Sequence, residues 1–75
     1  MQGLTRITID PEVMGGKACV RGRRVTVGMI VEAIAAGRTV QDILDDFPYL
    51  QGADVREALA YAASLAQGLE IGLAG

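Results

Sequence analysis

The sequence predicts a mostly α-helical domain with a short N-terminal β-ribbon, and three observations support this fold class. Residues 6–27 contain short runs of β-branched residues that are separated by turn residues. From residue 27 the apolar positions change to the three-and-four spacing of amphipathic helices. Residues 40–66 then form two such segments around a proline-containing turn, which is the outline of a helix-turn-helix. At 75 residues, the chain is expected to form one domain over residues 1–75.

The β-ribbon is predicted over residues 6–27. Residues 6–9 alternate polar and apolar side chains, and residues 20–27 are rich in valine and threonine. The intervening residues 10–16 include an Asp-Pro pair and a Gly-Gly pair, which are typical of turns. Gly22 interrupts the second strand, where a glycine often marks a bulge or a tight bend. Because a two-stranded ribbon is marginally stable in water, we expect it to pack on helices or on a second copy.

The first two helices follow directly from apolar spacing and capping residues. The first is predicted to begin at Val27, and its apolar face extends to Ile34. Gly37 follows the last apolar turn and suits the left-handed position that ends many helices. The second helix is predicted to begin after Thr39, whose hydroxyl can cap its first turn. Pro48 ends it, because the residue before a proline avoids helical angles.

The third helix is predicted to be the longest and to complete a three-helix bundle over residues 27–67. Its apolar stripe runs through residues 55–69. Ala60 and Ala63 fall outside this stripe, so they either support helix formation on an exposed face or provide a flat face for a second helix. Residues 68–75 contain glycines and show no clear period, which predicts a flexible tail.

The charges are unevenly distributed along the chain, which has seven basic residues, nine acidic residues and a net charge of −2. Residues 1–27 hold five bases and two acids, a net charge of +3, and residues 28–75 hold two bases and seven acids, a net charge of −5. Residues 15–27 contain four bases and no acid. These four bases are Lys17, Arg21, Arg23 and Arg24. Such asymmetry favours two surfaces with different partners.

This basic cluster is the predicted binding site, for a partner protein or for nucleic acid. Arginines can pair bidentately with carboxylates of a partner protein. A two-stranded ribbon can also enter the major groove of DNA, usually as a dimer. In a regular strand Arg21 and Arg23 would share one face and Arg24 would lie on the other, whereas a bulge at Gly22 would change this arrangement. A solvated ribbon without a partner is the alternative interpretation.

The helix-turn-helix outline offers a second candidate site for DNA. The start of the third helix would present Gln51 and Arg56 as recognition contacts. The same turns carry Asp54 and Glu57, and the preceding helix is acidic, so these residues would face the negatively charged phosphates. The ribbon is therefore the better candidate for nucleic acid as well.

No catalytic or metal site is predicted. The chain has no histidine, which excludes zinc ligation by cysteine and histidine together and catalysis by a nucleophile–histidine pair. Asp42, Asp45 and Asp46 share a helix face opposite the apolar stripe, which indicates a solvated flank and not a metal site. We therefore expect a protein that is not an enzyme and that needs no cofactor.

The sequence favours a cytoplasmic location. Cys19 is the single cysteine and cannot form an internal disulfide, so we expect a small buried residue in a reducing compartment. No run of about 18 apolar residues is present, which argues against a membrane span. The first ten residues lack the order of charged and apolar residues that is typical of a signal peptide.

Taken in order, these motifs resemble the small bacterial and archaeal proteins grouped as domain of unknown function 433. The resemblance covers residues 6–66. It rests on the following motifs: Arg6-Ile7, Asp10-Pro11, Gly15-Gly16-Lys17, Arg21-Gly22, Arg24-Val25, Val27, Ala35-Ala36-Gly37, Asp42-Ile43-Leu44, Asp46-Phe47-Pro48-Tyr49-Leu50 and Ala58-Leu59-Ala60-Tyr61-Ala62. Two positions depart from the family pattern, which has a proline where this chain has Ala18 and a threonine where it has Arg23.

The resemblance implies a homeodomain-like helix-turn-helix preceded by a β-ribbon. It also implies an antitoxin similar to the VapB type, which would neutralise a PIN-like nuclease toxin and repress its own operon. PIN-like nucleases hold a metal with a cluster of carboxylates, and Arg21, Arg23 and Arg24 would pair with those carboxylates.

Three functions stay open on the sequence. The first is an antitoxin-like module that binds a cognate nuclease. The second is a DNA-binding regulator that acts through the ribbon or the third helix. The third is a homo-oligomeric structural domain, a dimer or larger, whose arginines are only solvated.

Overall fold

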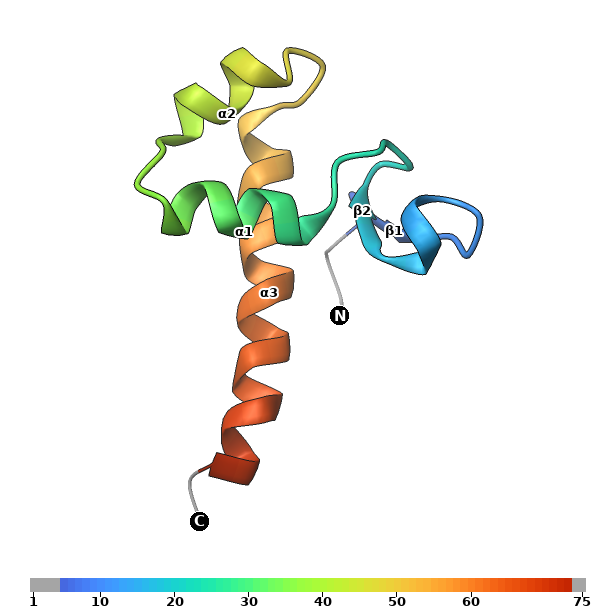
Figure 1. Cartoon of the computed structure of the whole chain (residues 1–75), viewed down its shortest axis with the longest axis vertical. Coiled ribbons are helices and arrows are strands. Elements are labelled where there is room, and N and C mark those ends of the chain that lie inside the picture. Colours follow the sequence, from blue (N-terminus) through green and yellow to red (C-terminus); the bar gives the residue numbers. More distant parts are fainter. Residues whose placement is uncertain (1–4, 74–75) are drawn as a thin grey trace.

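A computed structural model describes the backbone of residues 5–73 and the side chains of residues 5–68. Strands β1 (Ile7–Ile9) and β2 (Ala18–Val20) flank a single 3₁₀ turn, η1 (Met14–Gly16), and precede three helices. The helices are α1 (Val27–Ala35), α2 (Val40–Asp46) and α3 (Gly52–Leu73). In Figure 1, α1 lies across the upper part of α3, with α2 on one side and the ribbon on the other. The predicted mostly helical fold with an N-terminal β-ribbon is confirmed.

The ribbon is antiparallel but its second strand is shorter than predicted. β1 pairs with β2 so that Ile7 lies opposite Val20. The strand predicted over residues 20–27 is wrong in length, because β2 ends at Val20 and the chain turns sharply at Arg21 (φ 48°) and Gly22 (φ 70°). The chain then returns on itself, and the Val20 N–H donates to the carbonyl oxygen of Val25 at 3.0 Å. Residues Arg21–Arg24 thus form a tight loop, which we call the arginine loop.

The two helix ends that flank the α1–α2 connection follow the predicted capping chemistry. Gly37 adopts φ 89°, and its N–H donates to the Ile34 carbonyl at 2.9 Å while the Arg38 N–H donates to the Ala33 carbonyl at 3.0 Å. This pair of bonds is the Schellman motif, which uses the last free carbonyls of a helix. The Thr39 hydroxyl then accepts from the Asp42 N–H at 3.0 Å.

Helix α3 is longer than the sequence predicted. It continues to Leu73, so the tail expected over residues 68–75 is helical as far as Leu73, and residues 74–75 lie outside the described part. Gly68 and Gly72 each disfavour a helix by about 1 kcal/mol. That cost does not end a helix that is already nucleated, because each further residue adds a hydrogen bond.

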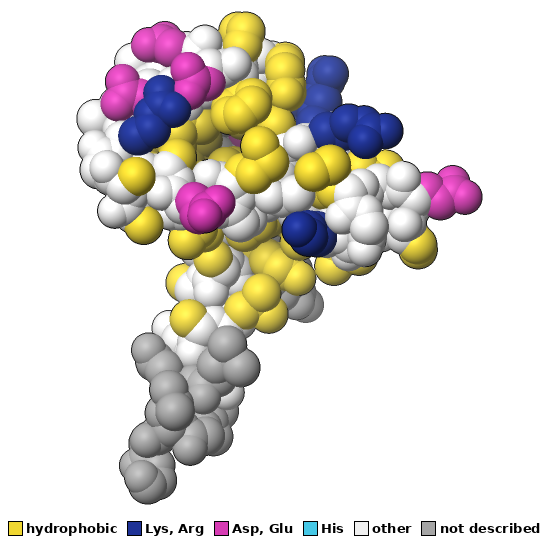
Figure 2. Space-filling view, in the orientation of Figure 1, with side chains coloured by type: hydrophobic (Ala, Val, Ile, Leu, Met, Phe, Trp, Pro, Cys, Tyr) yellow, Lys and Arg dark blue, Asp and Glu magenta, His cyan; other side chains and the backbone are white. Residues whose placement is uncertain are grey.

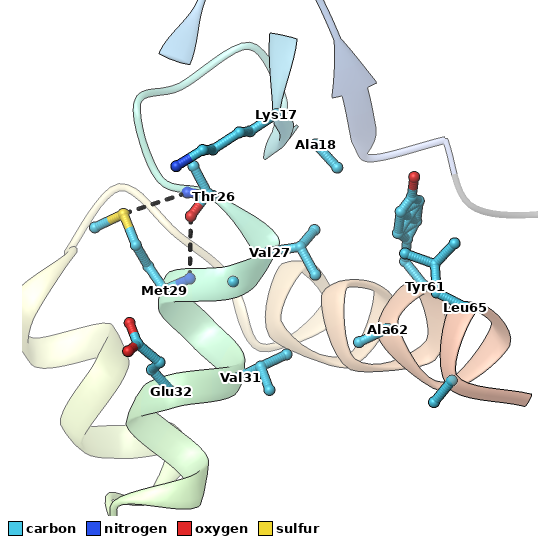
Figure 3. A pocket seen from close by; sticks show the side chains of 12 residues that line it. Lys17, Ala18, Thr26, Val27, Met29, Val31, Glu32, Tyr61, Ala62 and Leu65 are labelled. Carbon is cyan, nitrogen blue, oxygen red and sulfur yellow. Dashed lines mark hydrogen bonds between the residues drawn. The ribbon is translucent and has the colours of Figure 1, made fainter. Parts of the chain in front are cut away.

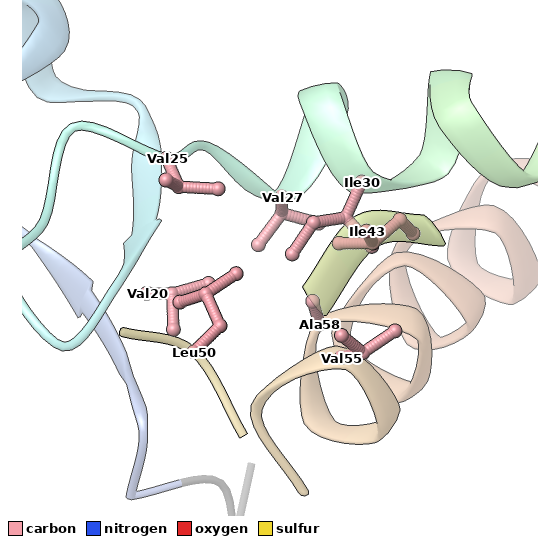
Figure 4. Close-up of a cluster of buried hydrophobic side chains, with 8 residues drawn as sticks. All are labelled: Val20, Val25, Val27, Ile30, Ile43, Leu50, Val55 and Ala58. Atoms are coloured by element: carbon pink, nitrogen blue, oxygen red, sulfur yellow. The ribbon is translucent and has the colours of Figure 1, made fainter. Parts of the chain in front are cut away.

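The core lies where α1, α2 and the first half of α3 meet the ribbon (Figure 4). Its side chains are aliphatic and almost fully excluded from water. They are Val20, Val25, Val27, Ile30, Ile43, Leu50, Val55 and Ala58. Cys19 is also buried, as its small apolar character predicts. In contrast, the side chains of residues 63–68 on α3 are all exposed, so the core supports only the first half of that helix.

Candidate interaction site

The arginine loop is anchored to the start of α3 by a buried carboxylate. The side chain of Asp54 is fully buried. Arg21 binds it bidentately, with Nε 3.1 Å from Oδ1 and Nη2 2.9 Å from Oδ2. Arg21 Nη2 also donates to the carbonyl oxygen of Tyr49 at 2.8 Å. These bonds offset the strain of a non-glycine residue at positive φ and fix the loop against the α2–α3 turn.

A second arginine, from the ribbon, completes this anchor. Arg6 Nη1 donates to Asp54 Oδ1 at 2.9 Å, and Arg6 Nε lies 2.9 Å from Oε2 of Glu57. Arg6 Nη1 also donates to the side-chain oxygen of Gln51 at 3.1 Å. The two arginines and two acids together carry no net charge. Arg21 therefore pairs with an acid of its own chain, and that acid already compensates its charge.

Asp54 also caps the helix to which it belongs. The Gln51 N–H donates to Asp54 Oδ2 at 2.8 Å, which provides a partner for a backbone donor that α3 itself cannot pair. Burial alone would raise the pKa of the Asp54 carboxyl. The Gln51 N–H and the guanidinium groups of Arg21 and Arg6 outweigh burial and hold this pKa below its ordinary value of 3.8.

This shift predicts how stability depends on pH. Because the pKa of Asp54 is lower in the folded than in the unfolded chain, its stabilising effect is complete above pH 3.8 and is lost as the pH falls through the folded pKa. We expect the Asp54→Asn variant to lose less stability than the wild type between pH 5 and pH 2 (roughly the range in which carboxyls titrate). Urea unfolding at several pH values measures this, and parallel curves for the two proteins would contradict it.

Arg23 lies over an aromatic ring on the neighbouring turn. Its Cζ atom is 4.8 Å from the centroid of the Tyr49 ring, which is a cation–π distance. The Tyr49 ring in turn meets Phe47 edge-on, with centroids 6.2 Å apart. Arg23 and Arg24 are both exposed, and neither forms an ion pair with any acid among residues 5–68. The loop thus presents two guanidinium groups that no described acid compensates, and the Tyr49 ring holds that of Arg23.

The acidic side chains gather on a different part of the molecule. In Figure 2, basic side chains cluster where the arginine loop lies, whereas acidic side chains cluster over α2. Arg38 forms an ion pair with Asp46 on this acidic face, which leaves Asp42 and Asp45 to keep it negative. The pKa of Asp42 is held below its ordinary value by the Thr39 N–H and hydroxyl. The charge separation seen along the sequence is therefore also a separation in space.

The structure divides the residues that the sequence predicted for binding. Arg21 and Arg23 meet at Tyr49, and Arg24 follows them in the same loop. Lys17 is elsewhere, at a groove beside α1 (Figure 3). Because residues 21–24 form a loop, the expected arrangement of Arg21 and Arg23 on one strand face does not hold.

The structure also shows where the two residues predicted as recognition contacts of the helix-turn-helix lie. Gln51 binds Arg6 through its side chain, and Arg56 is exposed beside Gly52 in the first turn of α3. Sequence reasoning missed the site roles of Arg6, Tyr49 and Asp54. One signal in the sequence pointed to the role of Asp54. It is the third residue of the third helix, a position from which an acidic side chain can cap the start of a helix.

Two absences hold for the described part of the chain. Within residues 5–68, no three acidic, cysteine or histidine side chains are grouped closely enough to hold a metal ion. None of the helices described here combines the length and apolar character needed to cross a membrane.

Comparisons with known proteins agree with the resemblance seen in the sequence. Residues 7–62 match the family described as "Protein of unknown function (DUF433)". The chain is also 38% identical over 56 residues to the "Uncharacterized protein y4eO" of Sinorhizobium fredii (strain NBRC 101917 / NGR234). That alignment covers 75% of this chain but only 25% of the length of the relative. No solved structure matches the chain. By the extent of the family match, the chain belongs to the DUF433 family of proteins of unknown function.

Proposed function

We propose that this chain is a non-catalytic binding module that docks its arginine loop on an acidic surface of a partner protein, in the manner of an antitoxin. One observation carries the proposal. Arg23 and Arg24 are exposed and uncompensated, in a loop that Arg21 and Asp54 hold in one conformation. A preorganised loop loses little conformational freedom when it binds, so its guanidinium groups can contribute their full affinity.

The chemistry of the loop fits carboxylates. Guanidinium groups bind carboxylates through two parallel hydrogen bonds, and fixed neighbours make this geometry specific. The antitoxin role implied by the resemblance to the DUF433 family suggests a partner with such a surface, the carboxylate cluster of a PIN-like nuclease. There Arg23 and Arg24 would occupy the acidic site and block its access to metal or RNA. The site would act in the cytoplasm, where the buried Cys19 stays reduced.

DNA binding through the helix-turn-helix is less well supported. The α2 helix presents an exposed Asp45 and a half-buried Asp42, which would repel phosphates. Gln51, one of the two predicted base contacts, already holds Arg6. The arginine loop alone offers two uncompensated charges, fewer than the six to ten phosphate contacts (approximately) of strong DNA-binding proteins.

Co-expression with the adjacent gene tests this proposal. The tagged chain is purified together with the neighbouring gene product, and the complex is sized and assayed for nuclease activity. We expect co-elution with a protein whose nuclease activity is silenced and returns when the chain is removed. Elution of the chain without a protein partner, or with nucleic acid that survives high salt, would contradict the proposal.

The ring of Tyr49 gives a finer prediction. Replacing Tyr49 with Ala removes the platform under Arg23 and is expected to weaken partner binding by about 1 kcal/mol, roughly fivefold in Kd. Tyr49→Phe keeps the ring and should bind as the wild type does. The carbonyl of residue 49 is retained in both variants, so Arg21 keeps its contact. Calorimetric titration measures both values, and equal losses in the two variants would contradict the role of the ring.

A further inference from the structure

A twelve-residue stretch of α3 carries no charged side chain. Residues 58–69 contain no Asp, Glu, Lys or Arg. Within this stretch, residues 63–68 all face solvent, and Leu65 is 54% exposed. Helix faces in contact with water usually carry charged residues. In Figure 1 the part of α3 beyond the core projects away from the other elements that the structure describes.

A groove begins where this uncharged stretch of α3 leaves the core. Its volume is about 730 Å³, and it lies between the start of β2, the first turns of α1 and the middle of α3. Figure 3 shows its apolar lining, which includes Val27, Val31 and Leu65. Lys17 and Glu32 lie at its rim on either side of Met29 (Figure 3). Neither forms an ion pair within the described residues.

We propose that a second copy of this chain covers the groove with its own α3, so that two copies form a symmetric pair. An uncharged helix can be buried against an identical helix without leaving any charge unpaired. The rim has one positive and one negative side chain. A two-fold axis between them would bring Lys17 of each copy to Glu32 of the other, so both ion pairs form at once.

A stable pair would need to bury only a modest part of the surface of this chain. From Ala58 to Leu69 the helix is about 18 Å long at 1.5 Å per residue. Stable interfaces bury about 600 to 1,000 Å² on each partner. The lower figure is roughly an eighth of the 4960 Å² surface of this chain. A domain with so small a core gains stability when such a surface is covered.

Charge reversal at the rim tests this pairing specifically. Lys17→Glu alone places two acids at each contact, and Glu32→Lys alone places two bases there. Each variant is expected to weaken self-association about tenfold, because a weak attraction becomes a repulsion at two symmetric contacts. Mixing the two variants should restore wild-type association, because every contact then joins an acid to a base. Sedimentation equilibrium measures the self-association of each variant and of their mixture.

A substitution at Leu65 tests the apolar part of the proposed interface. Leu65→Glu is expected to weaken association about 100-fold, because it buries an unpaired charge in the interface. Val40→Glu is the matched control, since Val40 is an exposed apolar residue on α2, and it should associate as the wild type does. Circular dichroism checks that each variant keeps its helices.

Three results would overturn the pairing. They are a wild-type chain that stays monomeric up to roughly 100 μM, a Leu65→Glu chain that associates normally, and mixed rim variants that associate no better than each alone. The inference is independent of the partner proposed for the arginine loop. The double variant Arg23→Ala/Arg24→Ala is expected to pair as the wild type does, so failure of one proposal can be told from failure of the other.

Discussion

Replacement of Asp54 by Ala is expected to lower the free energy of unfolding by about 3 kcal/mol. The change removes the cap of α3 and leaves Arg6 and Arg21 without their shared, fully buried acceptor. Breaking a buried ion pair costs about 3 to 5 kcal/mol. The lower end applies because both arginine side chains are about one-third exposed, so their guanidinium groups can regain water. For a domain of this size, such a loss is a large part of the total stability.

The matched control for this prediction is Asp45→Ala on α2. Asp45 is exposed and accepts only a hydrogen bond from the side chain of Gln41 among the described residues, so its loss should change stability by less than about 0.5 kcal/mol. Chemical unfolding followed by circular dichroism measures both variants. If Asp54→Ala is no less stable than Asp45→Ala, the anchor that we assign to Asp54 does not hold the loop.

The double variant Arg23→Ala/Arg24→Ala is expected to weaken partner binding at least about 100-fold while the fold stays intact. Both side chains are exposed and contribute nothing to the core, so the loss should appear in affinity and not in stability. Truncating charged groups that pair across an interface typically costs about 2 to 5 kcal/mol. Titration of the purified partner with wild type and variant measures this loss.

An arginine outside the loop provides the control. Arg38 is also exposed, but it pairs with Asp46 on the acidic face of α2. Arg38→Ala should therefore leave the affinity for the partner unchanged. If both variants lose affinity equally, binding responds to the overall charge of the chain and not to the arginine loop.

Local features of the sequence predicted the helices well. The apolar spacing from Val27, the cap at Thr39 and the left-handed Gly37 each depend on neighbours within about four residues. Such interactions are visible in the sequence, and the structure contains all three features. The length of α3 was underestimated because glycine weakens a helix without necessarily ending it.

The anchor of the arginine loop could not be predicted in the same way. Arg21 and Asp54 are 33 positions apart, and Arg6 and Asp54 are 48 apart. Only the packing of the ribbon against the α2–α3 turn brings them together. The cluster of basic residues suggested one surface with four charges. The structure instead assigns Arg21 to the intramolecular network around Asp54 and places Lys17 at the groove, so Arg23 and Arg24 are left as the uncompensated pair.

The central claim is that the arginine loop touches an acidic surface of a protein, and site-specific crosslinking in cells tests it most directly. A photoreactive amino acid is placed at position 24 in the loop and, as a control, at position 38 on the acidic face. The account predicts a protein adduct from position 24 alone, attached to a partner peptide rich in Asp and Glu. An adduct to nucleic acid at position 24, or a protein adduct formed only from position 38, would contradict it.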